Sequence, residues 1–148
     1  SRLTIQDLAG LLAERTGKRF VDSDLEIVRQ AGASIPEIFA ERGEAGFRKL
    51  EREVIAGLSG EQGIILATGG GAILNPANVD FLRANGRLFF LDRPLELLTA
   101  TQDRPLASDR EALERRYRER YSLYVASADV TIPGYGTPEE VAERIMAR

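Results

Sequence analysis

The 148-residue sequence contains no cysteine, no histidine and no tryptophan, and only one methionine. Without cysteine, disulfide bonds and thiolate chemistry are excluded. Without histidine, the usual proton carrier near neutral pH is missing, so acid–base work must fall to carboxylates, lysine or tyrosine. A zinc site also loses both of its favoured ligands. These absences restrict any chemistry to carboxylate, hydroxyl, amide and cationic groups.

Long apolar runs and an excess of basic charge are missing as well. No stretch of about 18 or more apolar residues occurs, and we find no signal-peptide pattern, so we expect a cytoplasmic protein that does not bind membranes. The formal net charge of −3, without a basic tail, argues against nucleic-acid binding. The length suits one domain with a real core, residues 1–148, and we expect a monomer.

Strand-like and helix-like patterns alternate along the chain. Short apolar runs predict strands at residues 18–24, 62–68, 87–92 and 129–134. Helical spacing predicts helices at residues 6–17, 34–58, 75–86, 108–127 and 137–148, the second of them broken near Gly43. This alternation predicts an α/β protein of three layers, α/β/α, with a parallel sheet covered on both faces.

Three consecutive glycines, Gly69, Gly70 and Gly71, directly follow the predicted strand 62–68. A glycine triplet costs backbone entropy in any regular element. It either ends the strand in a plain turn or allows the backbone to come very close to a ligand. In open parallel sheets, ligands bind at the carboxyl ends of the strands, and the triplet falls at such an end.

Acidic residues follow two other predicted strands. Asp22 and Asp24 alternate at the end of the first strand, so their carboxylates can point to the same side. The alternative is a helix N-cap followed by a solvated acid in the first turn. The segment "LDRP", residues 91–94, follows the third strand, and we interpret it as a strand that ends at a helix start.

Three arginines and a glutamate complete the candidate site. Arg48 and Glu51 share one helix face at spacing i, i+3, which often marks only a surface pair. Arg104 lies in a polar, loop-like segment, and Arg120 lies near the end of a long helix, where the helix dipole favours a cation. Together with the glycines and the two acids, these cations predict a site for an anionic polyol.

These motifs resemble those of the shikimate kinases. The matching stretches are "FVDSD", "SIPEIFAERGEAGFRKLE", "ATGGGAIL", "DRPL" and "RERYSLY…ADVTI", and the similarity runs from about Leu11 to the C-terminus. The resemblance implies an enzyme that transfers the γ-phosphate of ATP to the 3-hydroxyl of shikimate with Mg²⁺. It also implies a P-loop kinase fold with a five-stranded parallel sheet, a helical substrate-binding region at about 24–60 and a lid at about 100–110.

The resemblance further implies roles for the residues on the substrate side. Asp24 is similar to the acid that grips the shikimate hydroxyls and takes the proton during transfer. Arg48 and Arg120 resemble the pair that holds the substrate carboxylate, a task suited to planar forked donors. Glu51 would orient Arg48.

On the side where substrate and nucleotide meet, Gly69–Gly71 would present backbone N–H groups to the substrate. Asp22 resembles the acid near the magnesium ion. Arg104 resembles the lid arginine that reaches the phosphates and stabilises charge during transfer, which makes it a catalytic candidate beside the base. Tyr135 is either a flat surface near the adenine base or simply a turn tyrosine.

One family motif does not occur, the phosphate-binding loop G-x-x-x-x-G-K-[ST]; an ungapped count places its Lys on Ile5 and its Ser on Gln6. The first strand, which lies mid-sheet in the family, is missing or reduced to "SRLTI". Residues could be omitted before residue 1 or within residues 1–8, where we expect a break. Alternatively, the chain is a non-catalytic shikimate-binding or regulatory domain, or another chain supplies the strand. A kinase for another polyol acid, such as gluconate, also fits the two arginines.

Overall fold

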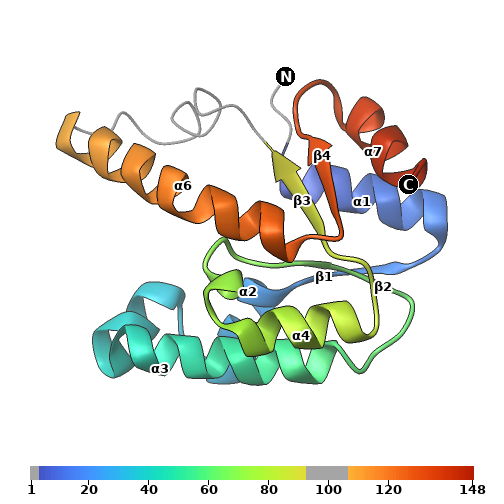
Figure 1. Ribbon diagram of the computed structural model, residues 1–148. Coiled ribbons are helices and arrows are strands. Elements are labelled where there is room, and N and C mark those ends of the chain that lie inside the picture. Colours follow the sequence, from blue (N-terminus) through green and yellow to red (C-terminus); the bar gives the residue numbers. More distant parts are fainter. Residues whose placement is uncertain (1–3, 93–106) are drawn as a thin grey trace. The chain divides into compact units, whose positions relative to one another are not determined.

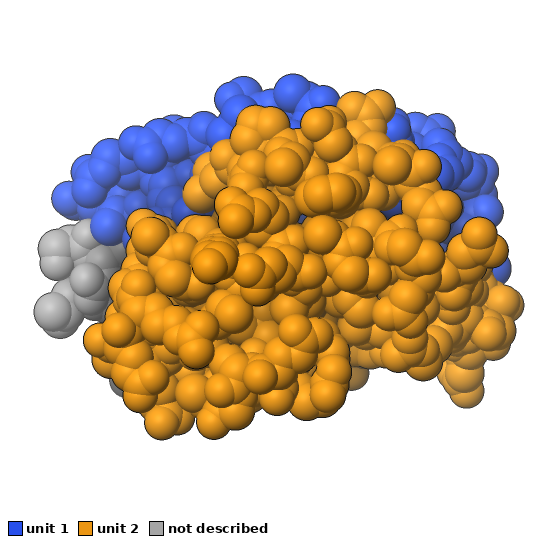
Figure 2. Space-filling view, turned by 90° about the horizontal axis from the view of Figure 1, so that it is seen from below, with its two compact units in different colours: residues 1–3, 87–148 blue, residues 4–86 orange. Residues whose placement is uncertain are grey.

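The computed structural model describes residues 4–92 and 107–148 (Figure 1). The chain divides into two compact units (Figure 2): unit 2 is Thr4–Gly86, and unit 1 is Arg87–Arg148 together with Ser1–Leu3. The elements of unit 2 are α1 (Ile5–Thr16), β1 (Arg19–Asp22), α2 (Ser23–Ala31), α3 (Ile35–Leu58), β2 (Ile64–Ala67), the short 3-10 helix η1 (Ala72–Leu74) and α4 (Pro76–Ala84). Those of unit 1 are β3 (Phe89–Asp92), α6 (Ala107–Ser127), β4 (Val130–Pro133) and α7 (Pro138–Met146).

The first described element is a helix with a regular N-cap. The hydroxyl of Thr4 accepts a hydrogen bond from the backbone N–H of Asp7 at 3.0 Å, and α1 then continues without interruption. This cap satisfies one of the free N–H groups at the helix start. The predicted break within residues 1–8 is therefore wrong from Thr4 onward, because this stretch starts a helix and not a strand. Residues 1–3 lie outside the described residues.

Unit 2 is built on a parallel pair of strands. β1 and β2 pair from Arg19 opposite Ile64 to Asp22 opposite Ala67. Figure 1 shows α1 on one side of this pair and α3 and α4 on the other. Apolar side chains of β1, α2 and α3 form the buried core, and they are Val21, Ile27, Ile38, Phe47, Val54 and Leu58.

The helix over residues 34–58 has the predicted form. Ser34 and Glu37 form a capping box at its start, each side chain bonded to the other's backbone N–H. Gly43 interrupts it with φ +69° and ψ −178°, so the predicted break is confirmed. The helix α2 was not predicted, and the strand before it ends at Asp22 and not at residue 24, because Asp22 caps this helix.

Unit 1 contains the second parallel pair. β3 and β4 pair from Phe89 opposite Val130 to Asp92 opposite Pro133, with α6 and α7 on opposite sides in Figure 1. The α/β class with parallel strands is thus confirmed, and the described residues hold four strands in two pairs. In the same part of the chain, no helix is long and apolar enough to cross a membrane.

Candidate active site

Asp22 ends β1 and caps α2. Its Oδ1 accepts hydrogen bonds from the backbone N–H groups of Asp24 at 2.9 Å and Leu25 at 3.3 Å. A carboxylate is favoured here because the N–H groups at a helix start are unpaired and the helix dipole is positive. The N-cap interpretation of Asp22 is therefore confirmed. Asp24 follows in the first turn, so both half-buried acids lie at the carboxyl end of β1.

The carboxylate of Asp24 faces the glycine triplet. A Cβ atom at position 69 would lie 3.1 Å from both Oδ1 and Oδ2 of Asp24. Burial raises the pKa of Asp24 above its ordinary value of 3.8, the charge of Asp22 adds to the rise, and Arg48 opposes it. Oδ1 is buried, and no residue that the structure describes donates a hydrogen bond to it. An unsatisfied buried acceptor is costly, so this atom is suited to a ligand hydroxyl.

Arg48 of α3 is bonded to a buried acid. Its Nη1 donates a hydrogen bond to Oε1 of Glu51 at 2.9 Å, and the side chain of Glu51 is only 1% exposed. On the solvent side, Nη2 lies 3.7 Å from Oε2 of Glu44, whose side chain is 69% exposed. The Cζ atom of Arg48 lies 5.2 Å from the ring centroid of Phe47. The pair of Arg48 and Glu51 is thus a buried anchor and not the common surface pair.

The guanidinium of Arg48 lies against the backbone of Gly71. A Cβ atom at position 71 would lie 2.7 Å from Cζ of Arg48 and overlap its nitrogens. Gly71 itself has φ −90°, which any residue adopts, so glycine is required here for space and not for conformation. Of the two interpretations of the triplet, this geometry favours the close approach of backbone to other groups over a plain turn.

Sequence reasoning missed Asn78, a residue of α4 that is 1% exposed. Its Nδ2 donates a hydrogen bond to the carbonyl oxygen of Ala72 at 2.9 Å, and the N–H of Ala72 donates to the carbonyl oxygen of Gly69 at 3.2 Å. The amide of Asn78 therefore holds the turn that carries the triplet. The only indication in the sequence was a lone asparagine inside a short predicted helix. The sequence does not show that the side chain of this asparagine points inward.

Arg120 belongs to unit 1, whereas Arg48 and Asp24 belong to unit 2. Arg120 is half-buried on α6, and among the described residues none forms an ion pair or hydrogen bond with its guanidinium. That Arg120 and Arg48 bind the same substrate carboxylate stays a prediction, because the two residues belong to separate units. Arg104, the predicted lid arginine, lies outside the described residues.

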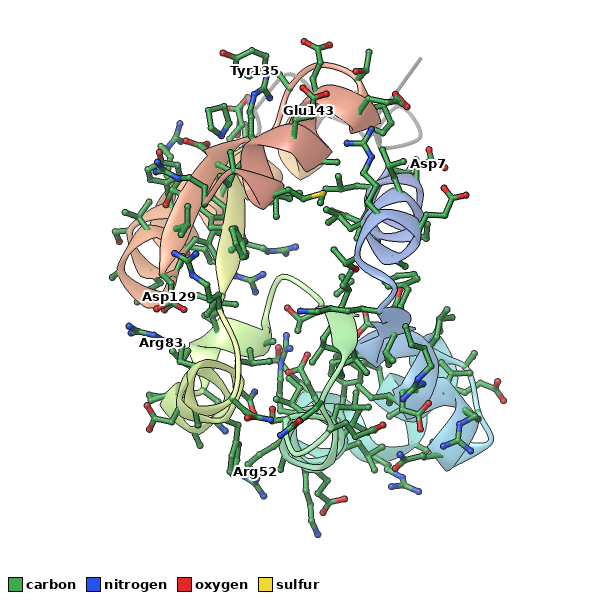
Figure 3. All side chains as sticks on the ribbon, turned by 90° about the vertical axis from the view of Figure 1, so that its right-hand side faces the viewer. Asp7, Arg52, Arg83, Asp129, Tyr135 and Glu143 are labelled. Carbon is green, nitrogen blue, oxygen red and sulfur yellow. The ribbon has the colours of Figure 1, made fainter. Side chains whose placement is uncertain are left out.

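A cavity of about 380 Å³ opens in unit 1 beside the carboxyl ends of β3 and β4, lined by Asp92, Thr131, Pro133 and Tyr135. Tyr135, labelled in Figure 3, extends from the loop that follows β4 and is 55% exposed. Nη1 of Arg144 donates to the carbonyl oxygens of Pro133 at 2.9 Å and Tyr135 at 2.6 Å, and its Cζ lies 4.9 Å from the ring centroid of Tyr135. The ring is thus held as a flat surface at the cavity.

No group of three or more histidine, cysteine, aspartate or glutamate side chains with metal-binding geometry occurs in the part of the chain that is described. The described residues bring a carboxylate close to Gly69 and a guanidinium close to Gly71, at the carboxyl ends of parallel strands. Such an α/β arrangement is suited to a small polar ligand that carries both hydroxyl and anionic groups.

Comparison with known proteins identifies the family. The shikimate kinase family model matches residues 7–148. Shikimate kinases of Aromatoleum aromaticum and Microcystis aeruginosa are 42% and 41% identical to the chain; the matches cover 82% and 94% of it, and 74% and 77% of those proteins. A shikimate kinase of Acinetobacter baumannii in complex with shikimate has a TM-score of 0.88 at 37% identity, over 95% of this chain and 83% of that one. The shikimate kinase of Aquifex aeolicus has a TM-score of 0.83 at 34% identity, over 96% of this chain and 86% of that one.

The chain belongs to the shikimate kinase family. Its function is that of an ATP-dependent phosphotransferase, which moves the γ-phosphate of ATP to the 3-hydroxyl of shikimate in aromatic amino acid biosynthesis. The prediction made from the motifs of the sequence is therefore confirmed.

Proposed function

We propose that Asp24, Arg48 and Gly69–Gly71 of unit 2 bind shikimate in this kinase, and that Arg120 also binds this substrate. The observation that carries the proposal is the pair of close approaches to the triplet, with Asp24 facing Gly69 and Arg48 lying against Gly71. These contacts hold an acid close to Gly69 and a cation close to Gly71. The related enzyme of Acinetobacter baumannii, in complex with shikimate, supports a site for this substrate in the same fold.

The two charged groups suit the two ends of the substrate. The guanidinium of Arg48 binds the shikimate carboxylate, because a planar fork of donors matches a carboxylate. Asp24 accepts hydrogen bonds from the ring hydroxyls and takes the proton of the hydroxyl that attacks the phosphate. Its pKa, raised by burial, makes its carboxylate a stronger base than that of an ordinary aspartate. Glu51 fixes the direction of the guanidinium through its 2.9 Å bond.

For the magnesium ion, Asp22 is the proposed protein ligand. Its Oδ1 is occupied by capping, but its Oδ2 accepts no hydrogen bond from the described residues. Mg²⁺ prefers oxygen ligands and takes most of them from water and phosphates, so one carboxylate oxygen at a strand end fits its needs. When bound, the ion neutralises charge on the phosphates.

For the nucleotide, the proposed residues are Tyr135 and Arg104. The cavity beside β4 and the ring of Tyr135, fixed by Arg144, form a flat apolar surface that suits stacking of a base. Arg104 would stabilise charge on the transferred phosphoryl group. We expect a Tyr135→Ala variant to raise the KM for ATP and to leave the KM for shikimate unchanged.

We also propose that the strands belong to the single five-stranded parallel sheet that is expected for the family.

Residues 1–148 contain no G-x-x-x-x-G-K-[ST] loop, and we propose that phosphoryl transfer requires one. A polypeptide of these residues alone should bind shikimate but release no ADP, because losing even one strong donor to a developing charge costs about 10²- to 10³-fold in rate. An assay of ADP release, on protein of verified mass, tests this. Turnover by that polypeptide would contradict it.

The shikimate site is tested by calorimetry with shikimate. We expect Arg48→Met to weaken binding by about 10-fold or more, because removing one partner leaves a desolvated carboxylate unpaired. Arg52, labelled in Figure 3, is exposed on the same helix, so Arg52→Met is the matched control and should bind as the wild type does. Wild-type affinity in the Arg48 variant would contradict the proposal.

A further inference from the structure

Asp92, the last residue of β3, joins this strand to two tyrosines of α6. Its Oδ1 accepts a hydrogen bond from the hydroxyl of Tyr117 at 3.2 Å, and its Oδ2 accepts one from the hydroxyl of Tyr121 at 2.7 Å. Hydrogen bonds to an ionised carboxylate are stronger than neutral ones. Both oxygens of one strand residue are therefore bonded to two positions one turn apart on a single helix.

Aromatic packing surrounds these bonds. The ring of Phe90 stacks on Tyr124 with centroids 5.0 Å apart and meets Tyr121 edge-on at 5.8 Å, and the rings of Tyr117 and Tyr121 are 5.7 Å apart. Ring contacts hold the helix on the strand but tolerate small shifts, since apolar attraction is not directional. Two hydrogen bonds to one carboxylate are directional, so they fix the rotation and the height of α6 over β3.

Arg120 lies on the stretch of α6 that Asp92 holds. Tyr121 follows it directly, and Tyr117 precedes it by three residues, so Tyr117 is its neighbour on the helix surface. In the described part of the chain, no acid pairs with Arg120. Since no ion pair within the described residues holds its guanidinium, the position of α6 decides where this group can reach.

We infer that Asp92 is a positioning residue for substrate binding, which acts through the hydroxyls of Tyr117 and Tyr121 to place Arg120. This inference rests on the proposed function, in which Arg120 binds the carboxylate of shikimate. It assigns a role to the aspartate of "LDRP", which the sequence alone presented as the end of a strand. A bidentate contact between guanidinium and carboxylate tolerates little misplacement, so a shift of α6 weakens the binding of shikimate.

Two other roles for Asp92 predict different results. If its bonds only stabilise unit 1, variants lower the melting temperature without a selective kinetic effect. If Asp92 instead contacts nucleotide, because it also lines the cavity beside β4, variants raise the KM for ATP. A positioning role predicts a raised KM for shikimate, with the KM for ATP and kcat little changed, since binding is lost equally from ground and transition states.

The test is steady-state kinetics with Tyr121→Phe, Tyr117→Phe and Asp92→Asn, on enzyme that carries a phosphate-binding loop. The two phenylalanine variants keep the rings and remove one hydroxyl each, so they retain the fold even if Asp92→Asn does not. We expect Tyr121→Phe to raise the KM for shikimate roughly three- to tenfold, while kcat and the KM for ATP change less than about twofold. Val141→Ala, at a fully buried position of α7 in the same unit, is the control for lost stability and should leave the KM for shikimate unchanged.

Arg120→Met in the same assay separates the role of Arg120 in binding shikimate from the positioning role of Asp92. If Arg120→Met raises the KM for shikimate and the tyrosine variants do not, the positioning role is wrong and the substrate site stands. If Arg120→Met leaves that KM unchanged, Arg120 does not belong to the site and the inference fails with it. An effect of the tyrosine variants that Val141→Ala reproduces, or one confined to ATP, also overturns the positioning role.

Discussion

The guanidinium of Arg48 occupies the space beside Gly71 that any larger residue would fill. A helix side chain and a strand-end backbone thus meet without an intervening side chain. Because Glu51 holds Arg48 from the buried side, the guanidinium cannot easily move away from an intruding group. The triplet and the arginine therefore depend on each other, so a substitution at either should affect the other.

The first prediction concerns Gly71→Ala. The new methyl group would overlap the guanidinium, and Arg48 must then either leave Glu51 or displace the loop. We expect the KM for shikimate to rise by about tenfold or more, because small misplacements of a binding group have large effects. Shikimate calorimetry measures the loss of binding, and steady-state kinetics on enzyme that carries a phosphate-binding loop measure the KM.

Gly57→Ala is the matched control for this substitution. Gly57 lies inside α3, and a Cβ atom there meets nothing within 4 Å. Alanine should therefore stabilise the helix by about 0.5–1 kcal/mol and leave the kinetics unchanged. An unaltered KM in the Gly71 variant would show that the contact with Arg48 is not needed for substrate binding.

The second prediction concerns the buried acid behind Arg48. Glu51→Gln keeps the shape of the side chain but removes the charge that faces the guanidinium. Removing one partner of a buried ion pair costs about 3–5 kcal/mol, and less is expected here because the side chain of Arg48 is 30% exposed. Thermal unfolding should show a melting temperature lower by several degrees, with a raised KM for shikimate.

Glu44→Gln separates burial from charge, because Glu44 also faces Arg48 but from an exposed position at 3.7 Å. An exposed ion pair contributes about 0–1 kcal/mol, so this variant should unfold close to the wild-type temperature. Equal effects of the two substitutions would mean that burial of Glu51 does not strengthen its hold on Arg48.

The third prediction joins stability to activity at Asp24. Because burial and Asp22 raise its pKa, the fold favours the protonated form, and at neutral pH the ionised form weakens the fold. Asp24→Asn should therefore raise the melting temperature at pH 7. That difference should shrink as the pH falls through the raised pKa of Asp24, since the wild-type group then becomes neutral. The same variant loses the proposed base, so kcat should fall about 10²- to 10⁴-fold.

Asp80→Asn, at an exposed position of α4, is the control for this experiment and should change neither property. Melting curves at several pH values and kinetics with saturating substrates provide the data. A lower melting temperature for the Asp24→Asn variant at pH 7 would show that attraction to Arg48 outweighs the burial of Asp24, contrary to the direction of its pKa.

The parts of this site that follow from backbone chemistry could be predicted from the sequence. Glycine fits where space is limited, so a close approach of the backbone was one of the two interpretations that the sequence allowed for the triplet, beside a plain turn. Gly43 likewise marked the break in the long helix, which is present at φ +69°. Both features depend on local rules that hold wherever the residue occurs.

The contacts that depend on packing could not be predicted in this way. The i, i+3 spacing of Arg48 and Glu51 is the same on a surface and over a core, and only tertiary packing leaves Glu51 at 1% exposure. Asn78 and Asp92 bond to partners six and at least 25 residues away, and no periodicity relates such positions. The short helix α2 was missed because the acids "DSD" resemble a strand end as much as a helix start.

The last prediction concerns the ionisation of Tyr117. Burial raises its pKa to about 12, and the charge of Asp92 and the hydrogen bond to it add to the rise. The fold therefore favours the neutral phenol, and its contribution to stability is complete below the ordinary tyrosine pKa of 10 and is lost as the pH rises towards 12. Asp92→Asn removes the charge, so Tyr117 should titrate at lower pH, and stability should depend less steeply on pH above 10. Absorbance of tyrosinate during alkaline titration measures the pKa, and Tyr117→Phe identifies which of the transitions belongs to this residue. If the high-pH transition of Tyr117 is the same in the wild type and in Asp92→Asn, the carboxylate does not act on this hydroxyl in solution.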